Sequence, residues 1–118
     1  MKVIALTHHV DKRELPMLEI RPNCECCDKD LPPESTEAMI CTYECTFCVT
    51  CVEDILSNVC PNCGGGFMPR PIRPKTARRE GLSIHHQLPS TKRVHTSYTI
   101  EELKAFGEQF KHIAPENR

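Results

Sequence analysis

Hydrophobic residues along this 118-residue chain form short, separated runs. Alternating apolar and polar residues predict a brief strand at residues 18–21, and an apolar triplet predicts another short strand at residues 38–40. At residues 52–59, four apolar side chains share one face at helical spacing, which predicts about two turns of helix. The pattern therefore predicts a small α+β fold with a short β hairpin and a short helix.

The clearest pattern is an amphipathic helix near the C-terminus, over residues 100–113. Its apolar stripe has members three or four positions apart: Ile100, Leu103, Phe106, Phe110 and Ile113. Thr99 and Glu102 have the spacing of a capping box, and Pro115 follows the last apolar residue. We expect this helix to dock on the rest of the chain, on a second copy, or in a groove of a partner.

These signals divide the chain into four parts. Residues 1–16 are expected to be an N-terminal extension, with Met17 as a plausible true start, and residues 17–68 a folded module. Residues 69–98 are rich in proline and arginine and lack periodicity, which predicts an extended linker. Residues 99–114 then form the helical tail.

The composition predicts a thin apolar core. The chain has no Trp, four Phe and two Tyr, but ten Pro and nine Cys. A chain of this kind needs additional stabilisation, which a structural metal supplies as folding free energy. The cysteines are therefore expected to determine the fold.

Eight of the nine cysteines have the spacing of metal ligands. They are Cys24-x2-Cys27, then Cys41-x3-Cys45-x2-Cys48-x2-Cys51, then Cys60-x2-Cys63. A gap of two residues lets both sulfurs of a pair reach one ion. All-thiolate ligand sets favour Zn²⁺, so we expect two zinc ions in two closed four-cysteine sites.

An iron–sulfur cluster is the competing interpretation of these thiols. The stretch from Cys45 to Cys51 copies part of a bacterial ferredoxin run, but eight residues then separate Cys51 from Cys60, where that run has three. The other cysteines would also lack a purpose.

The cellular location decides between metal binding and disulfides. No signal-peptide pattern is present near the N-terminus, and no stretch has the roughly 20 apolar residues of a membrane span. We therefore expect a reducing, cytoplasmic location, where paired cysteines bind metal more often than they form disulfides. Closed sites leave no open coordination position for a water, so no enzymatic activity is expected.

The spacing permits two ways of pairing the ligands. In a cross-brace, the first and third pairs share one ion and the second and fourth pairs share the other. In sequential pairing, the first four ligands hold one ion and the last four hold the other. Spacing alone does not choose between them.

The order of the cysteines resembles that of RING fingers, with Cys45 where those proteins usually have histidine. This zinc-finger family is cross-braced, which implies one site of Cys24, Cys27, Cys48 and Cys51 and another of Cys41, Cys45, Cys60 and Cys63. Ubiquitin-ligase activity is not implied, because Asp28 and Gly64 depart from that pattern and the chain has no Trp.

A closer resemblance covers about residues 17–74. The stretches LEIRPNCECCDKDLPP (18–33), ECTFC (44–48) and VCPNCGG (59–65) look like a family of short bacterial proteins known as domain of unknown function twelve seventy-two. The resemblance implies a cysteine-rich, zinc-binding module in a bacterial cytosol, with no established activity.

The most favoured function is a structural-zinc module that binds another protein. One alternative is a nucleic-acid-binding regulator that contacts phosphate through the basic linker: Arg70, Arg73, Lys75, Arg78 and Arg79. Against it, aromatic residues for base stacking are missing there, and eight thiolates with two divalent ions would change the net charge from −1 to −5. A second alternative is a thiol and zinc redox switch through the ninth cysteine, Cys26, which we otherwise expect to be a bystander on the surface.

Overall fold

The structure, a computed structural model, describes residues 17–118. The predicted N-terminal extension therefore lies outside the described residues. A small antiparallel sheet stands at the centre of the module, with strand order β2-β1-β3. Its strands are β1 (Ala38–Ile40), β2 (Thr46–Cys48) and β3 (Met68–Pro69). The predicted strand at residues 38–40 is confirmed as β1, and the α+β class is confirmed with it.

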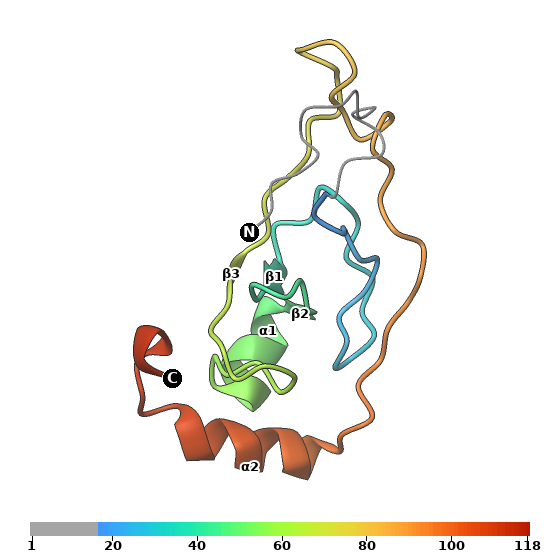
Figure 1. The fold of residues 1–118 in the computed structure, drawn as a ribbon. Coiled ribbons are helices and arrows are strands. Elements are labelled where there is room, and N and C mark those ends of the chain that lie inside the picture. The colour runs from blue at the N-terminus through green and yellow to red at the C-terminus, as the bar shows by residue number, and fades with distance from the viewer. Residues whose placement is uncertain (1–16) are drawn as a thin grey trace, which may run out of the picture.

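Four helical segments complete the fold (Figure 1). They are the single turn α1 (Val49–Cys51), the π-helical segment η3 (Val52–Leu56), the helix α2 (Ile100–Phe110) and the 3₁₀ turn η4 (Pro115–Asn117). Within residues 17–118, no helix combines the length and the apolar character that crossing a membrane requires.

The strand predicted at residues 18–21 is wrong, because side chains from far along the chain take its backbone acceptors. Arg73 Nη2 donates to the Leu18 carbonyl at 2.8 Å, and Arg70 Nη1 donates to the Arg21 carbonyl at 2.8 Å. The segment is thus held in place by guanidinium groups and forms no ladder with a neighbouring strand.

The helix predicted at residues 52–59 begins and ends earlier than its apolar pattern suggests. It starts at Val49 directly after β2, widens into the π-helical segment, and stops because Ser57 and Asn58 have positive φ values of 54° and 59°. Asparagine tolerates this left-handed conformation better than most residues. The Asn58 side chain also accepts a hydrogen bond from the Phe67 N–H at 2.9 Å, which ties the helix end to the segment before β3.

The core combines sulfur atoms with a few large apolar side chains. Phe47 and Phe67 meet edge to face with ring centroids 5.4 Å apart. Leu31 and Leu56 are fully buried beside them, together with most of the cysteines. The thin core predicted from composition is therefore present as a mixed apolar and sulfur cluster.

After β3 the chain runs away from the sheet, turns, and returns alongside the N-terminal part of the module before entering α2 (Figure 1). The capping box at the start of α2 is confirmed, since Glu102 N–H donates to Thr99 Oγ1 at 3.1 Å and Thr99 N–H donates to Glu102 Oε1 at 2.8 Å. The helix ends at Phe110, three residues before the predicted end. It docks against η3 through a narrow contact, because Leu103 is 2% exposed whereas Ile100 is 42% exposed.

Candidate metal centre

Two groups of sulfur atoms assemble around the central sheet. In the first group, four sulfurs lie within 4.8 Å of one another, from Cys24, Cys27, Cys48 and Cys51. This is the grouping of a cross-brace, since the first and third pairs along the chain come together.

The second group contains three sulfurs within 4.8 Å of one another, from Cys41, Cys45 and Cys60. All three are buried. The eighth predicted ligand, Cys63, lies three residues after Cys60 in the same turn and is exposed, but its sulfur is not part of this close group. The first group therefore contains four sulfurs and the second contains three, and Cys63 lies in the same turn as Cys60 of the second group.

Three of the four cysteine pairs are held by a backbone turn. In the first turn, Cys24 N–H donates to the Lys29 carbonyl at 2.8 Å, and Asp28 N–H donates to the Cys24 carbonyl at 2.8 Å. Asp28 has φ of 65°, a left-handed conformation that reverses the chain directly after the second cysteine. The N–H groups of Cys26 and Cys27 point at Cys24 Sγ, at 3.4 and 3.5 Å.

The last turn repeats the first in detail. Cys60 N–H donates to the Gly65 carbonyl at 2.8 Å, Gly64 N–H donates to the Cys60 carbonyl at 2.7 Å, and Gly64 has φ of 81°. The Gly65 N–H points at Cys63 Sγ at 3.4 Å. Sequence analysis identified the cysteine pairs but missed this structural repeat, whose only signal is a turn-forming residue directly after each pair.

A tighter turn presents Cys41 and Cys45. Glu44 N–H donates to the Cys41 carbonyl at 3.0 Å, Glu44 has φ of 69°, and Tyr43 N–H points at Cys41 Sγ at 3.3 Å. Cys48 and Cys51 follow at the end of β2 and in α1, so a strand, a helix and three turns deliver the eight sulfurs.

The donor set suits a soft divalent cation. Burial raises the pKa of the Cys24 and Cys41 thiols to about 11, and burial together with the charge of Cys24 raises the pKa of Cys51. Several thiolates cannot share so small and buried a space without a compensating positive charge. A bound metal ion would supply that charge, and the backbone N–H groups aimed at sulfur would stabilise the thiolates.

A buried carboxylate links the first turn to the sheet. Glu25 is buried, and its Oε2 accepts hydrogen bonds from Arg21 Nη1 at 2.6 Å and from Thr46 N–H at 2.7 Å. Sequence analysis missed this residue, because a charged side chain between two cysteines is ordinarily expected at the surface.

The ninth cysteine is not at the surface. Cys26 is only 8% exposed and packs in the core cluster beside the first sulfur group. The expectation of a surface bystander is therefore wrong in its placement. The Cys24-to-Cys27 turn directs this side chain inward, and its burial raises its thiol pKa.

The five basic linker residues that the sequence suggested as phosphate contacts fall into two sets. Arg70 is 4% exposed and donates to the carbonyls of Arg21, Leu31 and Pro32 at 2.8 to 3.2 Å. Lys75, Arg78 and Arg79 are all exposed. Of the five residues predicted to contact phosphate, only this second set is exposed.

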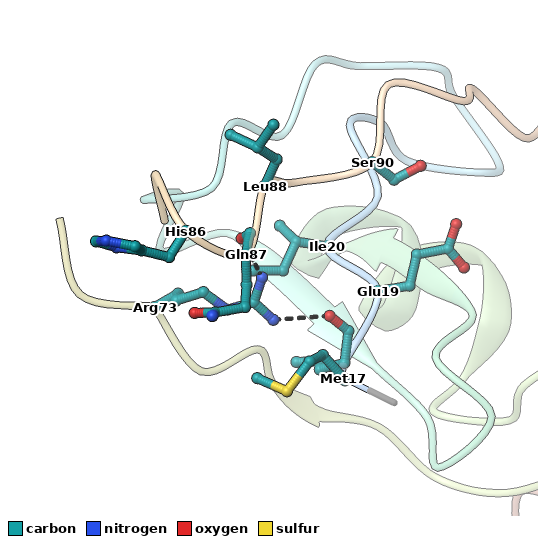
Figure 2. A pocket seen from close by; sticks show the side chains of 9 residues that line it. Met17, Glu19, Ile20, Arg73, His86, Gln87, Leu88 and Ser90 are labelled. Atoms are coloured by element: carbon teal, nitrogen blue, oxygen red, sulfur yellow. Dashed lines mark hydrogen bonds between the residues drawn. The ribbon is translucent and has the colours of Figure 1, made fainter. Parts of the chain in front are cut away.

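Arg73 belongs with Arg70, because its guanidinium is used inside the protein. Figure 2 shows it in a pocket of about 370 Å³, where it donates to the carbonyls of Gln87 at 2.6 Å and Leu18 at 2.8 Å. Arg73 therefore fastens the outgoing chain to its returning half and to the start of the module.

Comparison with known proteins places the module in a family. The profile of a family described as "Protein of unknown function (DUF1272)" matches residues 17–73. An uncharacterised protein of Rhizobium meliloti (strain 1021) is 66% identical over 58 residues, which are 49% of this chain and 69% of that protein. No solved structure matches the chain.

Proposed function

Because this chain belongs to the DUF1272 family, whose matched segment contains all nine cysteines, we propose that its module holds two structural Zn²⁺ ions and presents a rigid surface to a partner protein. The observation that carries the proposal is the assembly of seven sulfurs, six of them on buried cysteines, from distant turns into two close groups. Soft thiolate donors favour Zn²⁺ over harder cations. The identity of the metal is the first matter to test.

In this proposal the first ion is held by Cys24, Cys27, Cys48 and Cys51. The second is held by Cys41, Cys45, Cys60 and Cys63, with the exposed Cys63 side chain closing the site. Such ions supply about 10 to 16 kcal/mol of folding free energy each in small peptides, which suits a chain with few aromatic residues. Four thiolates saturate a tetrahedral ion, so a stabilising rather than a catalytic role follows.

The test is metal content and stoichiometry on protein purified without added metal, by elemental analysis with native mass spectrometry. Two zinc ions per chain are expected. Iron with acid-labile sulfide, or metal-free protein with oxidised thiols, overturns the proposal. Cys63→Ser tests the eighth ligand, since it is expected to weaken one zinc at least tenfold while leaving the other in place.

Protein binding needs its own measurement. We propose a reducing, cytoplasmic setting, in which the thiolates stay available for metal. A tagged chain expressed in bacterial cells should co-purify with the same partner in repeated experiments, and Cys60→Ser should abolish this because its module cannot fold around both ions. A partner retained equally by Cys60→Ser contradicts a role for the metal-stabilised surface.

Exposed linker cations favour one second candidate, binding of a nucleic acid. Lys75, Arg78 and Arg79 are in no ion pair within the described residues. Retention on RNA or DNA that falls with salt, and that is lost in Arg78→Gln together with Arg79→Gln, supports this candidate. Retention unaffected by the two substitutions excludes the linker as the contact.

A further inference from the structure

Residues 88–118, which we call the tail, pack along one face of the module. The tail first runs extended beside the first cysteine turn. The Asn23 side chain donates to the Val94 carbonyl at 2.8 Å and accepts from the Val94 N–H at 3.2 Å, while Thr96 N–H donates to the Glu25 carbonyl at 2.8 Å. These bonds read the backbone of the tail and tolerate many side chains, as in the recognition of extended peptides.

Charge adds selectivity to this backbone recognition. Arg93 donates to Asp28 Oδ1 at 2.9 Å, to Asp30 Oδ1 at 2.8 Å and to the Asp28 carbonyl at 2.7 Å. Residues 17–69 contain nine carboxylates and only two basic side chains, whereas residues 88–99, the extended half of the tail, contain two basic side chains and no carboxylate. The module is therefore rich in carboxylates, and the charged side chains in the extended half of the tail that lies on it are all positive.

The second half of the tail docks as a helix with a small residue at its closest contact. Gly107 packs against the backbone of Leu56, so near that a Cβ placed on the glycine would lie 2.5 Å from the Leu56 oxygen. Leu103, one turn earlier, is buried against the same segment. The face thus accepts an extended stretch followed by a helix that has a leucine and, four residues later, a glycine.

The fit between tail and module is incomplete. A groove of about 520 Å³ remains along the extended half, bordered by small or polar tail residues. It is lined from the module by Ile20, Pro22, Leu31, Pro32 and Pro33 with the charged Arg21 and Asp30, and from the tail by Pro89, Ser90, Thr91 and Arg93. A chain with larger apolar side chains at these tail positions would fill the groove and bind more tightly.

The segment that matches the family ends between the module and the tail. Every module residue that contacts the tail lies within the matched residues 17–73, and the tail lies outside them. From these observations, we propose that the face is a binding site for a partner segment of extended, arginine-containing chain followed by a short amphipathic helix, and that the tail is its resident occupant. The inference rests on the proposed protein-binding function and names its surface and ligand.

The experiment separates the tail from the module without removing it. A specific protease site is inserted between Ala77 and Arg78, which lie in the exposed outer part of the linker. After cleavage, both fragments are expected to co-elute in size-exclusion chromatography, because the docked tail, together with the linker bonds from Arg73 to Gln87 and from Ile84 to Pro74, holds them. A labelled peptide of residues 88–118 is then expected to exchange into the complex and to saturate at one copy per module.

Two peptide variants identify the face. Gly107→Val in the peptide should lower its affinity about tenfold or more, through the clash with Leu56. Gln109→Ala, at an exposed position of the same helix, should bind like the original peptide. Separation of the fragments on cleavage, failure of the peptide to exchange, or equal binding of the Gly107→Val peptide would each overturn the proposal.

Zinc measured on the same cleaved sample separates the two hypotheses. Two retained zinc ions without peptide exchange reject the docking face alone, whereas absence of zinc rejects the proposed metal centre.

Discussion

Gly107→Ala should destabilise α2, which is the opposite of its effect in a solvent-exposed helix, and it therefore tests how α2 is packed. In a solvent-exposed helix this substitution stabilises, because alanine exceeds glycine in helix propensity by about 1 kcal/mol. Here the new Cβ would lie 2.5 Å from the Leu56 oxygen and 3.2 Å from the Leu56 carbonyl carbon. Both are backbone atoms, so they cannot rotate away and the helix must move.

The magnitude follows from the two opposing effects. Overpacking a tight contact costs about 1–3 kcal/mol, which offsets the propensity gain and leaves a net loss of up to about 2 kcal/mol. Ala105→Gly is the matched control, since Ala105 is exposed on the same helix and loses about 1 kcal/mol through propensity alone. Both substitutions should therefore weaken the helix, although they change propensity in opposite directions.

Hydrogen exchange of the amides in residues 100–110 measures this directly. A loss of 1–2 kcal/mol accelerates exchange by about 5- to 30-fold. If Gly107→Ala instead slows exchange while Ala105→Gly accelerates it, helix propensity dominates and the close packing on Leu56 is refuted.

Three further substitutions or treatments test the rest of the structure. Cys60→Ser should lose one zinc and unfold much of the module, whereas Cys26→Ser should keep both ions. Native mass spectrometry and thermal unfolding of the two variants measure this difference. Two zinc ions retained in Cys60→Ser would contradict the role of Cys60 as a ligand. Arg70→Met leaves three carbonyls without their charged donor and should destabilise by about 3 kcal/mol, while the exposed control Arg78→Met should change stability by less than about 0.5 kcal/mol in denaturant unfolding. Chelation of the metal should raise hydrogen exchange in the module and the tail together, and a tail that stays protected would show that it does not depend on the metal.

Local signals made part of the fold predictable from sequence. β1 and the capped start of α2 follow from short-range patterns, and the cysteine spacing located the sulfurs that the structure brings together. The resemblance to cross-braced proteins also implied the four-sulfur group that assembles from the first and third pairs. These features depend on residues close together in sequence or on a strict spacing.

The features that sequence analysis missed depend on distant partners. An alternating pattern at residues 18–21 predicts a strand, yet Arg70 and Arg73, about fifty residues later, take the backbone acceptors that a strand would use. The amphipathic pattern of α2 predicts that the helix docks but gives no sign that Gly107 is a contact point, because only the position of Leu56 makes a side chain impossible there. A single sequence contains no information on such pairings.

The first and last cysteine turns and the tail are connected by hydrogen bonds. In each turn, the residue directly after the second cysteine adopts a left-handed conformation, and an arginine of the tail donates to its carbonyl: Arg93 to Asp28 at 2.7 Å and Arg118 to Gly64 at 3.3 Å. Metal ions in the two proposed sites would fix these turns and with them the two carbonyls, so the proposed metal binding would favour docking of the tail. By linkage, docking of the tail must favour metal binding to the same extent. A partner that displaces the tail therefore has to replace both arginine contacts, or the metal centre loses part of its stability.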